Sequence, residues 1–430
     1  MQSNAEASQV AGVPASTVSA STMWVPEGIA SIAVLSDLHL GAFGMVGRGA
    51  SVLDVRDGRD PMGPSGPFER FLRDEVGRHD AVVLLGDILE LALATYDQTA
   101  PRAARLISLL RQHCADVVYF VPGNHDHYAW TMVQDAAAVT RRFPHFTANY
   151  FPTHQIGQVS DTFLRTIGID HVAYPMLAWR PAPGSQHSYL FHHGHFCSET
   201  YTLVSSFYRD LFDGQLTHLA QLEGMNAGWL NLIWYHLGQA GIGVGANGLV
   251  ERIYEELRAT GTSPAVTRAV ERLYRLKLAP PLRAALRRYA DETWWLTTAA
   301  ADWLAGRLDT AMPAWLTKAI LAYADHEERS GGRGVSVDRG RQLDGSLVAQ
   351  ADALLRMVMA SEPQLVAGDT TLVFGHTHVK GRADSPTARY LNTGGWVTPP
   401  SGAWPDAYVL SIDATDARFI AYRGGQAHVA

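Results

Sequence analysis

The chain has 430 residues, of which 47% are apolar and 18% are charged, and its formal net charge is −7. This composition is typical of a globular protein with a hydrophobic core, and it argues against wholesale disorder and against a basic protein that coats nucleic acid. Two cysteines cannot form a disulfide framework in a chain of this length, so a cytoplasmic location is predicted. The 18 histidines are the one anomaly in the composition.

The first 28 residues are rich in Ser, Ala, Thr and Val and contain neither Lys nor Arg. They also lack a continuous apolar block, so the pattern does not indicate a secretory signal. We expect residues 1–28 to form a disordered tail.

Residues 29–121 predict strands that alternate with helices. Apolar runs at 29–35, 81–85 and 117–121 are typical of buried strands, and apolar residues recur at helical spacing in 68–76 and 102–114. This order predicts parallel strands joined by right-handed crossovers, with a site beyond the carboxyl ends of the strands. Polar clusters occupy those three ends: Asp37-Leu38-His39, Gly86-Asp87 and Gly123-Asn124-His125-Asp126.

The remaining chain predicts a second half of the same domain, interrupted by helices. Short strands are expected at 163–169 and 188–191, and the latter ends in His192-His193-Gly194-His195. Residues 198–325 have a helical, Trp-rich pattern, 327–345 read as a loop and 346–360 as a helix. A strand at 370–374 ends in Gly375-His376-Thr377-His378, and the segments 390–392, 408–412 and 418–422 alternate like antiparallel strands. We therefore expect one split α/β domain, 29–197 and 346–430, with a helical cap inserted at 198–345.

Residues 224–250 carry no charged side chain, so a membrane span has to be considered. Seven glycines and several polar residues interrupt the segment, which favours a buried helix with a Gly-rich loop. A peripheral membrane contact through the cap is an alternative. Residues 268–288, which hold seven basic residues against one Glu, could provide it, or could hold a second phosphate of a substrate.

The polar residues at the strand ends predict a metal centre. Oxygen and imidazole ligands without thiolate suit Mn, Fe, Zn, Ni or Mg, with Mn as the first candidate, and seven ligands exceed what one tetrahedral ion uses. Two divalent ions then require a bridging carboxylate, for which Asp87 on the central strand is the candidate. Two divalent ions carry more positive charge than the two aspartates remove, which favours a phosphate substrate. A hydroxide that bridges the ions would attack the phosphorus. The predicted ligands are Asp37, His39, Asp87, Asn124, His193 or one of its neighbouring histidines, His376 and His378.

These ordered blocks resemble the calcineurin-like metallophosphoesterase superfamily, over roughly 30–197 and 365–422. The resemblance implies a four-layer αββα sandwich with a dinuclear site at its edge. It implies that Asp37, His39, Asp87 and His378 hold one ion and that Asp87, Asn124, His193 and His376 hold the other. It further implies that His125 lies over the phosphate as a catalytic residue, oriented by Asp126. The segment Asn392-Thr393-Gly394-Gly395 is similar to the family's closing motif, with Gly395 in place of Ser.

The resemblance implies a phosphoesterase acting on a phosphomonoester or phosphodiester, with a small-molecule or lipid-linked substrate. An alternative is a pyrophosphatase acting on a nucleotide-linked lipid or sugar, similar to the UDP-diacylglucosamine hydrolases. The chain departs from that branch, because His125 stands where its members have Arg and the insertion is longer. Two further classes are disfavoured: a non-catalytic scaffold, because every motif residue is present, and a nuclease, because the net charge is negative. His195 could support the centre or contact substrate.

Overall fold

The structure is a computed structural model. It describes residues 25–41, 51–55, 58–91, 94–132, 154–155, 163–198, 201–202, 204–206, 216, 219–236, 256, 264–275, 279–280, 283–284, 286–287, 298–329, 342–397, 407–423 and 426–429. The tail expected at 1–28 falls mostly outside these ranges.

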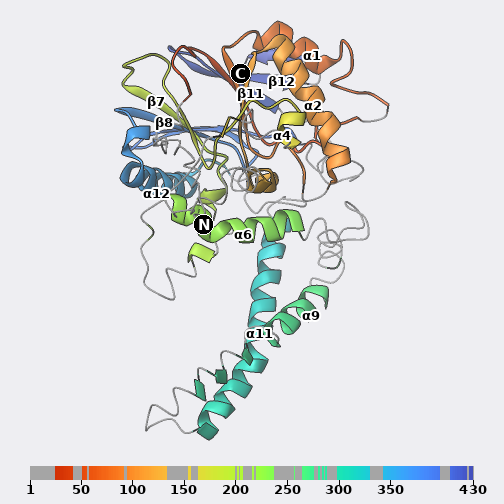
Figure 1. The fold of residues 1–430 in the computed structure, drawn as a ribbon, viewed down its shortest axis with the longest axis vertical. Helices are drawn as coiled ribbons and strands as arrows, with labels where there is room; N and C mark the ends of the chain where they lie inside the picture. Colours follow the sequence, from red (N-terminus) through yellow and green to blue (C-terminus); the bar gives the residue numbers. More distant parts are fainter. Residues whose placement is uncertain are drawn as a thin grey trace, which may run out of the picture.

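A large mixed sheet forms one half of the core (Figure 1). Its strand order is β13-β12-β11-β1-β2-β3-β5-β4, and β1, β2, β3 and β5 run parallel. The strands span Ile32–Leu35 (β1), Ala81–Leu85 (β2), Val117–Val121 (β3), His154–Gln155 (β4), His171–Val172 (β5), Ala407–Ile412 (β11), Ala417–Arg423 (β12) and Gln426–Val429 (β13).

The second sheet, also mixed, contains five strands in the order β6-β7-β8-β10-β9. These span Leu177–Trp179 (β6), His187–Phe191 (β7), Asp369–Phe374 (β8), Lys380–Asp384 (β9) and Arg389–Thr393 (β10). Strand β7 precedes the helical insertion and β8 follows it, yet the two pair in parallel from His187↔Asp369 to Phe191↔Val373. The split domain expected from the sequence is therefore joined across the insertion by direct strand pairing.

Alternation of side chains along the strands separates the core into layers. In β1, Ile32 and Val34 point into a core shared by the two sheets, whereas Ala33 and Leu35 point outward onto helices. The outer face of the large sheet is covered by Pro67–Phe71 (α1), Leu72–Val76 (η2), Tyr96–His113 (α2) and Phe163–Thr166 (α4). Gly345–Ser361 (α12) covers the outer face of the second sheet, followed by Pro363–Leu365 (η7). Two facing sheets with helices outside agree with the expected αββα order.

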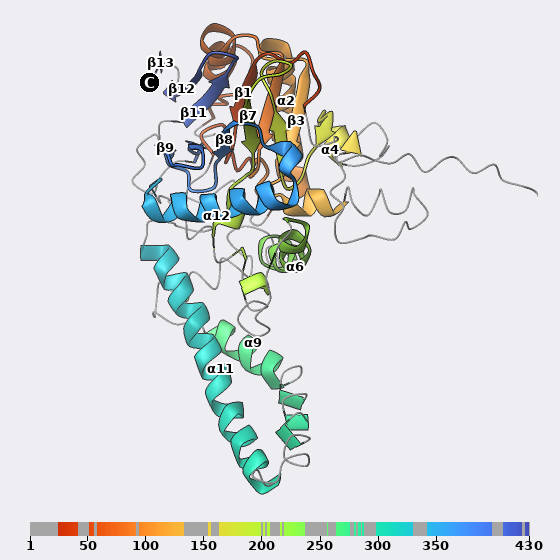
Figure 2. The same ribbon diagram turned by 90° about the vertical axis from the view of Figure 1, so that its left-hand side faces the viewer.

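The short helix His195–Cys197 (η4) follows β7 and ends the first part of the core. The insertion contains Leu219–Asn231 (α6), Leu232–His236 (η5), Pro264–Leu273 (α9) and Thr298–Arg329 (α11). Helix α6 packs on the core near α12, whereas α9 and α11 pack on each other and extend away from the sheets (Figure 2). Among the described residues of these three helices, those of α6 join the core cluster of the second sheet. None of the helices in the described part of the chain is long and apolar enough to cross a membrane.

Ion pairs within the insertion neutralise part of the basic stretch at 268–288. Arg283 and Arg287 on this stretch contact Asp309 and Asp302 of α11. Arg268 and Arg272 on α9 are exposed. The excess of positive charge that suggested a membrane or phosphate contact is thus smaller than the sequence of this segment alone indicates.

Several predicted boundaries are confirmed, and one element type is wrong. The bounds of β2 and β3 match the predicted runs, whereas α2 begins at Tyr96, earlier than predicted, because Thr95 and Gln98 form a capping box. The segment 163–169 contains the short helix α4 in place of a strand. Leu164 and Ile167 are spaced to bury one helical face, and Gly168, with φ of 96°, follows the helix in the left-handed region. Of the closing segments, β10 runs antiparallel to β9 and parallel to β8, and β11 and β12 are antiparallel to each other.

Candidate metal centre

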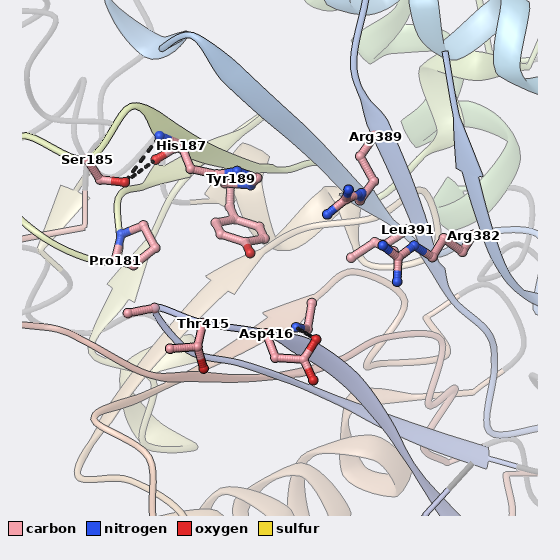
Figure 3. A pocket seen from close by; sticks show the side chains of 11 residues that line it. Pro181, Ser185, His187, Tyr189, Arg382, Arg389, Leu391, Thr415 and Asp416 are labelled. Carbon is pink, nitrogen blue, oxygen red and sulfur yellow. Dashed lines mark hydrogen bonds between the residues drawn. The ribbon is translucent and has the colours of Figure 1, made fainter.

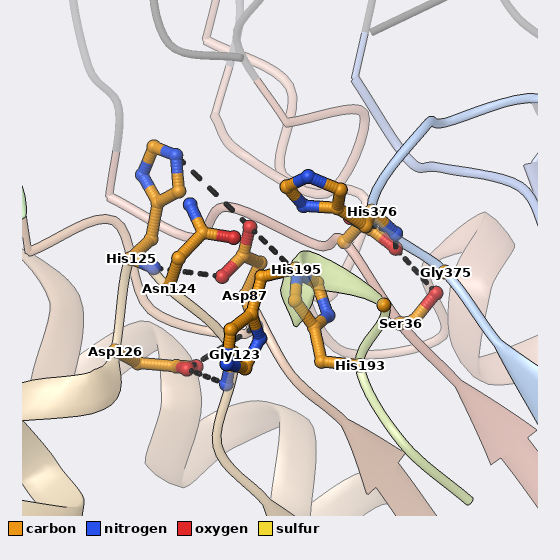
Figure 4. A network of polar contacts seen from close by, with 12 residues as sticks. Ser36, Asp87, Gly123, Asn124, His125, Asp126, His193, His195, Gly375 and His376 are labelled. Atoms are coloured by element: carbon orange, nitrogen blue, oxygen red, sulfur yellow. Dashed lines mark hydrogen bonds and ion pairs between the residues drawn. The ribbon is translucent and has the colours of Figure 1, made fainter. Parts of the chain in front are cut away.

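The predicted ligands follow strands that end at one edge of the paired sheets. In the large sheet β1, β2 and β3 lead to Asp37, Asp87 and Asn124, and in the second sheet β7 and β8 lead to His193 and His376. Because parallel strands end at the same edge, side chains far apart in sequence gather there (Figure 4). The ligands are 0–2% exposed, apart from His378 at 9%.

The backbone at five of the seven predicted ligands lies in the left-handed region. The φ values are 54° at Asp37, 45° at His39, 53° at Asp87, 71° at His376 and 59° at His378. Residues other than glycine adopt this region rarely and at an energetic cost, and such strain concentrates at functional sites. The strained backbone positions are therefore the positions that orient the ligand side chains.

One group of potential ligands comprises Asp37, His39 and His378, whose ligand atoms lie within 4.8 Å of one another. The Nε2 atom of His378 is 3.2 Å from Asp37 Oδ1 and 3.1 Å from His39 Nε2. Asp37 is held in place by the backbone N–H of His376, which donates to its carboxylate at 3.0 Å. This group matches the first ion position implied by the family resemblance.

A second group comprises Asp87, His193 and His376 within the same 4.8 Å limit. The Nε2 atom of His193 is 3.2 Å from Asp87 Oδ2, and that oxygen is also 3.8 Å from His39 Nε2 in the first group. Asp87 therefore lies between the two groups, as a bridging carboxylate would. Asn124 contributes a neutral amide beside the second group (Figure 4).

The donor set fits two divalent cations. Asn124 Oδ1 and His193 Nε2 are buried, and neither makes a hydrogen bond with the described residues. Buried polar atoms normally have a partner, so these atoms indicate a ligand that the protein itself does not supply. Carboxylate, amide and imidazole donors suit divalent ions of the Mn, Fe, Zn, Ni and Mg group.

The charges of the carboxylates also indicate a cation. Burial lowers the pKa of His193, but the nearby charges of Asp87 and Asp37 outweigh burial and raise the pKa to about 10. Burial raises the pKa of Asp37, and His378 and His193 reverse this effect and lower it. A bound divalent ion would take the place of the His193 proton, because an imidazole binds metal through a deprotonated nitrogen.

Glu90 orients two of the predicted histidines, and the sequence analysis did not identify it. Its Oε2 is 2.7 Å from His39 Nδ1, and its Oε1 is 2.8 Å from His125 Nδ1. Glu90 is buried, and although burial raises its pKa, His125 and His39 lower it to about 2. Carboxylates that hold the second nitrogen of a ligand histidine fix its ring and its tautomer. One signal was present in the sequence, since Glu90 is the sole charged residue between Asp87 and Asp97.

The hydrogen bonds of Asp126 run to the backbone of two loops. Its carboxylate accepts backbone N–H groups of Asp87, Ile88 and Leu89 at 3.2, 2.8 and 3.3 Å, and that of Gly123 at 2.6 Å. Glu90, rather than Asp126, contacts the Nδ1 atom of His125. Asp126 thus ties the loop after β2 to the loop after β3. Burial and the charge of Asp87 raise its pKa to about 6.

Gly86 shows why a glycine precedes the bridging candidate. Its φ is 78°, and a Cβ placed on it would lie 2.4 Å from His193 Nδ1. Any side chain would displace the histidine, so glycine lets β2 end directly against the loop after β7. In that position His193 Nδ1 is 3.0 Å from the carbonyl oxygen of Leu85, which leaves Nε2 for a ligand.

The closing segment supports the first group through Ser36. The Ser36 hydroxyl donates to Asp37 Oδ2 at 2.6 Å and is 2.5 Å from Thr393 Oγ1. Asn392 donates to the carbonyl oxygen of Gly375 at 3.0 Å and thereby holds the loop that carries His376 and His378. The sequence analysis predicted neither the contact of Ser36 with Asp37 nor the contact of Thr393 with Ser36.

The other histidines of the two motifs lie around the centre without joining either ligand group. His192 is buried, and its Nδ1 accepts the backbone N–H of Gly194 at 2.9 Å. His195 is buried, with Nε2 3.0 Å from the Tyr174 hydroxyl. His127 contacts Glu223 of α6 at 3.0 Å. Both His195 and His127 thus belong to a polar network behind the centre.

A separate cavity of about 170 Å³ lies elsewhere in the fold (Figure 3). Arg382, Arg389 and His187 line it, and Arg389 forms an ion pair with Asp384 at 3.0 Å. His187 begins β7, whereas the predicted ligand His193 follows the other end of that strand. This cavity is therefore not part of the candidate centre.

Comparisons with known proteins agree with the motifs. Residues 30–236 match the calcineurin-like phosphoesterase family. No curated protein sequence matches the chain.

Solved structures that are similar to the chain include three hydrolases of low sequence identity. A cold-active protein-tyrosine phosphatase of a psychrophilic Shewanella species is 12% identical, with 96% of this chain and 84% of that chain covered and a TM-score of 0.30. A dimetal phosphatase from Danio rerio is 15% identical, with 91% and 95% covered and a TM-score of 0.34. The phosphopantetheinyl hydrolase of Mycobacterium tuberculosis is 13% identical, with 86% and 91% covered and a TM-score of 0.25.

The family match includes the loops after β1, β2, β3 and β7, which carry Asp37, His39, Asp87, Asn124 and His193. It ends within the insertion, before the loop that carries His376 and His378. The matched segment, residues 30–236, belongs to the calcineurin-like phosphoesterase family, and the protein is a hydrolase of phosphate esters.

Proposed function

We propose that the chain hydrolyses a phosphomonoester or phosphodiester at a centre of two divalent metal ions, with Mn as the first candidate. The observation that carries this proposal is the pair of buried ligand groups with Asp87 between them. When bound, the two ions would supply a water of lowered pKa as nucleophile and positive charge for the phosphoryl oxygens. Asp37, His39, Asp87 and His378 would hold one ion, and Asp87, Asn124, His193 and His376 the other.

His125 is the proposed catalytic histidine. It is 1% exposed, its backbone N–H donates to Asp87 Oδ1 at 2.8 Å, and its Nε2 lies 4.0 Å from Asp87 Oδ2. Glu90 contacts Nδ1, so Nε2 is the nitrogen on the side of the bridging carboxylate. A ring held in this way can donate a hydrogen bond or a proton to the phosphate ester oxygen that leaves.

Hydrolysis of nitrophenyl phosphate and of bis(nitrophenyl) phosphate tests the proposal. The Mn-loaded protein should release nitrophenol from at least one ester, and Asp87→Asn should abolish release because it removes the shared charge. Asp116→Asn, the same change at an exposed residue, is the matched control and should retain activity. Equal activity in wild type and Asp87→Asn, or none with any divalent ion, would contradict the proposal.

The natural substrate is a separate question. A panel of phosphomonoesters, phosphodiesters and lipid-linked pyrophosphates distinguishes the main proposal from the pyrophosphatase alternative. We expect the simple esters to be cleaved faster, because α9 and α11 extend away from the sheets (Figure 2).

A further inference from the structure

Glu223 connects the inserted helix α6 to the two loops behind the second ligand group. It lies in the first half of Leu219–Asn231 and is 5% exposed. A buried carboxylate is stable only when charged or polar partners compensate for the loss of water. Each of its two oxygens has such a partner on the phosphoesterase core.

One oxygen contacts the loop after β3. Glu223 Oε1 is 3.0 Å from His127 Nε2, and the other ring nitrogen of His127 is 2.8 Å from Asn231 Oδ1 on the same helix. Both nitrogens of this buried ring are thus held by α6. His127 follows Asn124 by three residues, so α6 fixes the loop that carries the amide ligand.

The other oxygen reaches the loop after β7 through a tyrosine. The Tyr174 hydroxyl donates to Glu223 Oε2 at 2.9 Å and is 3.0 Å from His195 Nε2. A tyrosine hydroxyl has one proton, so with that proton on Glu223 it accepts a hydrogen bond from His195 Nε2–H. His195 follows the ligand His193 by two residues, and Glu223 therefore also fixes this loop and the tautomer of His195.

The two loops carry Asn124 and His193, the members of the second ligand group that make no hydrogen bond through their ligand atoms. Among the described residues, Asn124 Oδ1 has no hydrogen-bond partner, and His193 Nε2 lies 3.2 Å from Asp87 Oδ2, itself a predicted ligand. Their loops are held from behind, by a residue 96 positions from His127 and 49 from Tyr174.

We propose that Glu223 of the inserted helix α6 is a positioning residue that holds the Asn124 and His193 loops at the spacing required by the second metal ion. This inference rests on the two-metal function proposed above. It assigns the insertion a role in the metal centre itself, separate from any selection of substrate.

Mn(II) binding to the chelated protein tests this role without an activity assay. Wild type should bind two ions per chain and give the spectrum of an exchange-coupled Mn pair in electron paramagnetic resonance. Glu223→Gln should lower the affinity for one of the two ions by about 10- to 100-fold, as is typical when a residue that orients a metal ligand is removed. Its spectrum should be that of isolated Mn(II). Tyr174→Phe removes only the connection to His195, so it should lower the affinity for the same ion by less than Glu223→Gln does.

Two double variants identify which ion is affected. The double variant Asn124→Ala/Glu223→Gln should bind Mn(II) only slightly more weakly than Asn124→Ala alone, because both changes act on the second ion. Adding His378→Ala to Glu223→Gln should lower Mn(II) affinity more than adding Asn124→Ala does, because His378 belongs to the first group. The control Glu271→Gln removes an acidic group from α9, where it lies 3.8 Å from Arg275, and should bind both ions as wild type does.

The outcomes separate this inference from the proposed function. If wild type binds fewer than two ions, the two-metal function itself fails. If wild type binds two and folded Glu223→Gln and Tyr174→Phe bind them with unchanged affinity, the role of Glu223 is refuted. Should Glu223→Gln fail to fold, Tyr174→Phe decides alone, because it keeps the buried ring and loses one hydroxyl.

Discussion

Single carboxylates at this centre act by holding several groups at once. Asp87 lies between the ligand groups, Glu90 contacts two histidines, and Asp126 accepts backbone N–H groups from two loops. Each is buried, so each depends on its partners for its charge. The chemistry of the site therefore rests on shared partners more than on any one ligand.

His125→Ala should separate catalysis from metal binding. His125 is not one of the seven proposed ligands, and in its cluster with His39 and Glu90 both histidines contact the Glu90 carboxylate, so its loss should leave both ions bound. Turnover should fall by about 10²- to 10⁴-fold, the range for loss of a general acid. Metal content by atomic emission and kcat on a nitrophenyl ester check this, and undiminished kcat would remove the proposed role.

Glu90→Gln should impair the centre without touching an ion. The variant keeps the side-chain shape but loses the charge that holds His39 and His125, so we expect a loss of about 10- to 100-fold in metal affinity or activity. Glu69→Gln, a partly buried acid near His113, is the control. Activity equal to wild type in Glu90→Gln would show that both rings are held by other contacts.

At the scale of elements, the sequence predicted most of what positions the ligands. The strands before Asp87 and Asn124 were predicted with correct bounds because their apolar runs end abruptly at Gly86 and Pro122. The prediction that the ligand loops gather at one edge of the sheet came from the parallel order of the strands. Glu90 and Glu223 were missed because their partners lie 35 to 96 residues away, and only packing brings them together. The segment 163–169 was misassigned because a short apolar run suits a strand and a helix face equally.

The contact between α6 and the loop after β3 should depend on pH. Burial alone lowers the pKa of His127, but the charge of Glu223 outweighs burial and raises the pKa above its usual 6.5. The ion pair therefore stabilises the fold fully when the pH is below the pKa that His127 has in the unfolded chain. This stabilisation is lost as the pH rises through the higher pKa that His127 has in the folded chain. In the metal-free protein, the difference in unfolding free energy between wild type and Glu223→Gln should shrink as the pH rises from below 6.5 into the alkaline range. A difference that is constant across this range would show that the two groups do not form an ion pair.

At the scale of the whole molecule, the centre joins the two halves of the chain. Each ligand group combines residues before the insertion with His378 or His376 after it. Strand pairing between β7 and β8 and between β1 and β11 joins the same halves. Metal binding and folding of the split domain should therefore be coupled.

Metal removal should lower the thermal stability of the whole fold. Ions that bind only the folded chain stabilise it by about 2.7 kcal/mol at one hundred times their dissociation constant. Differential scanning calorimetry should show a Tm that rises with divalent ion concentration in wild type and much less in Asp87→Asn. A Tm that is unaffected by metal in wild type would indicate that the ligand groups do not bind it.

The most direct test of the account is a stoichiometric titration. The chelated protein receives increasing Mn(II), and bound ions and hydrolysis of a nitrophenyl ester are measured on the same samples. We predict that binding saturates at two ions per chain and that activity follows occupancy of the second ion. Full activity in the chelated protein, or saturation at a single ion with full activity, would contradict a two-metal phosphoesterase.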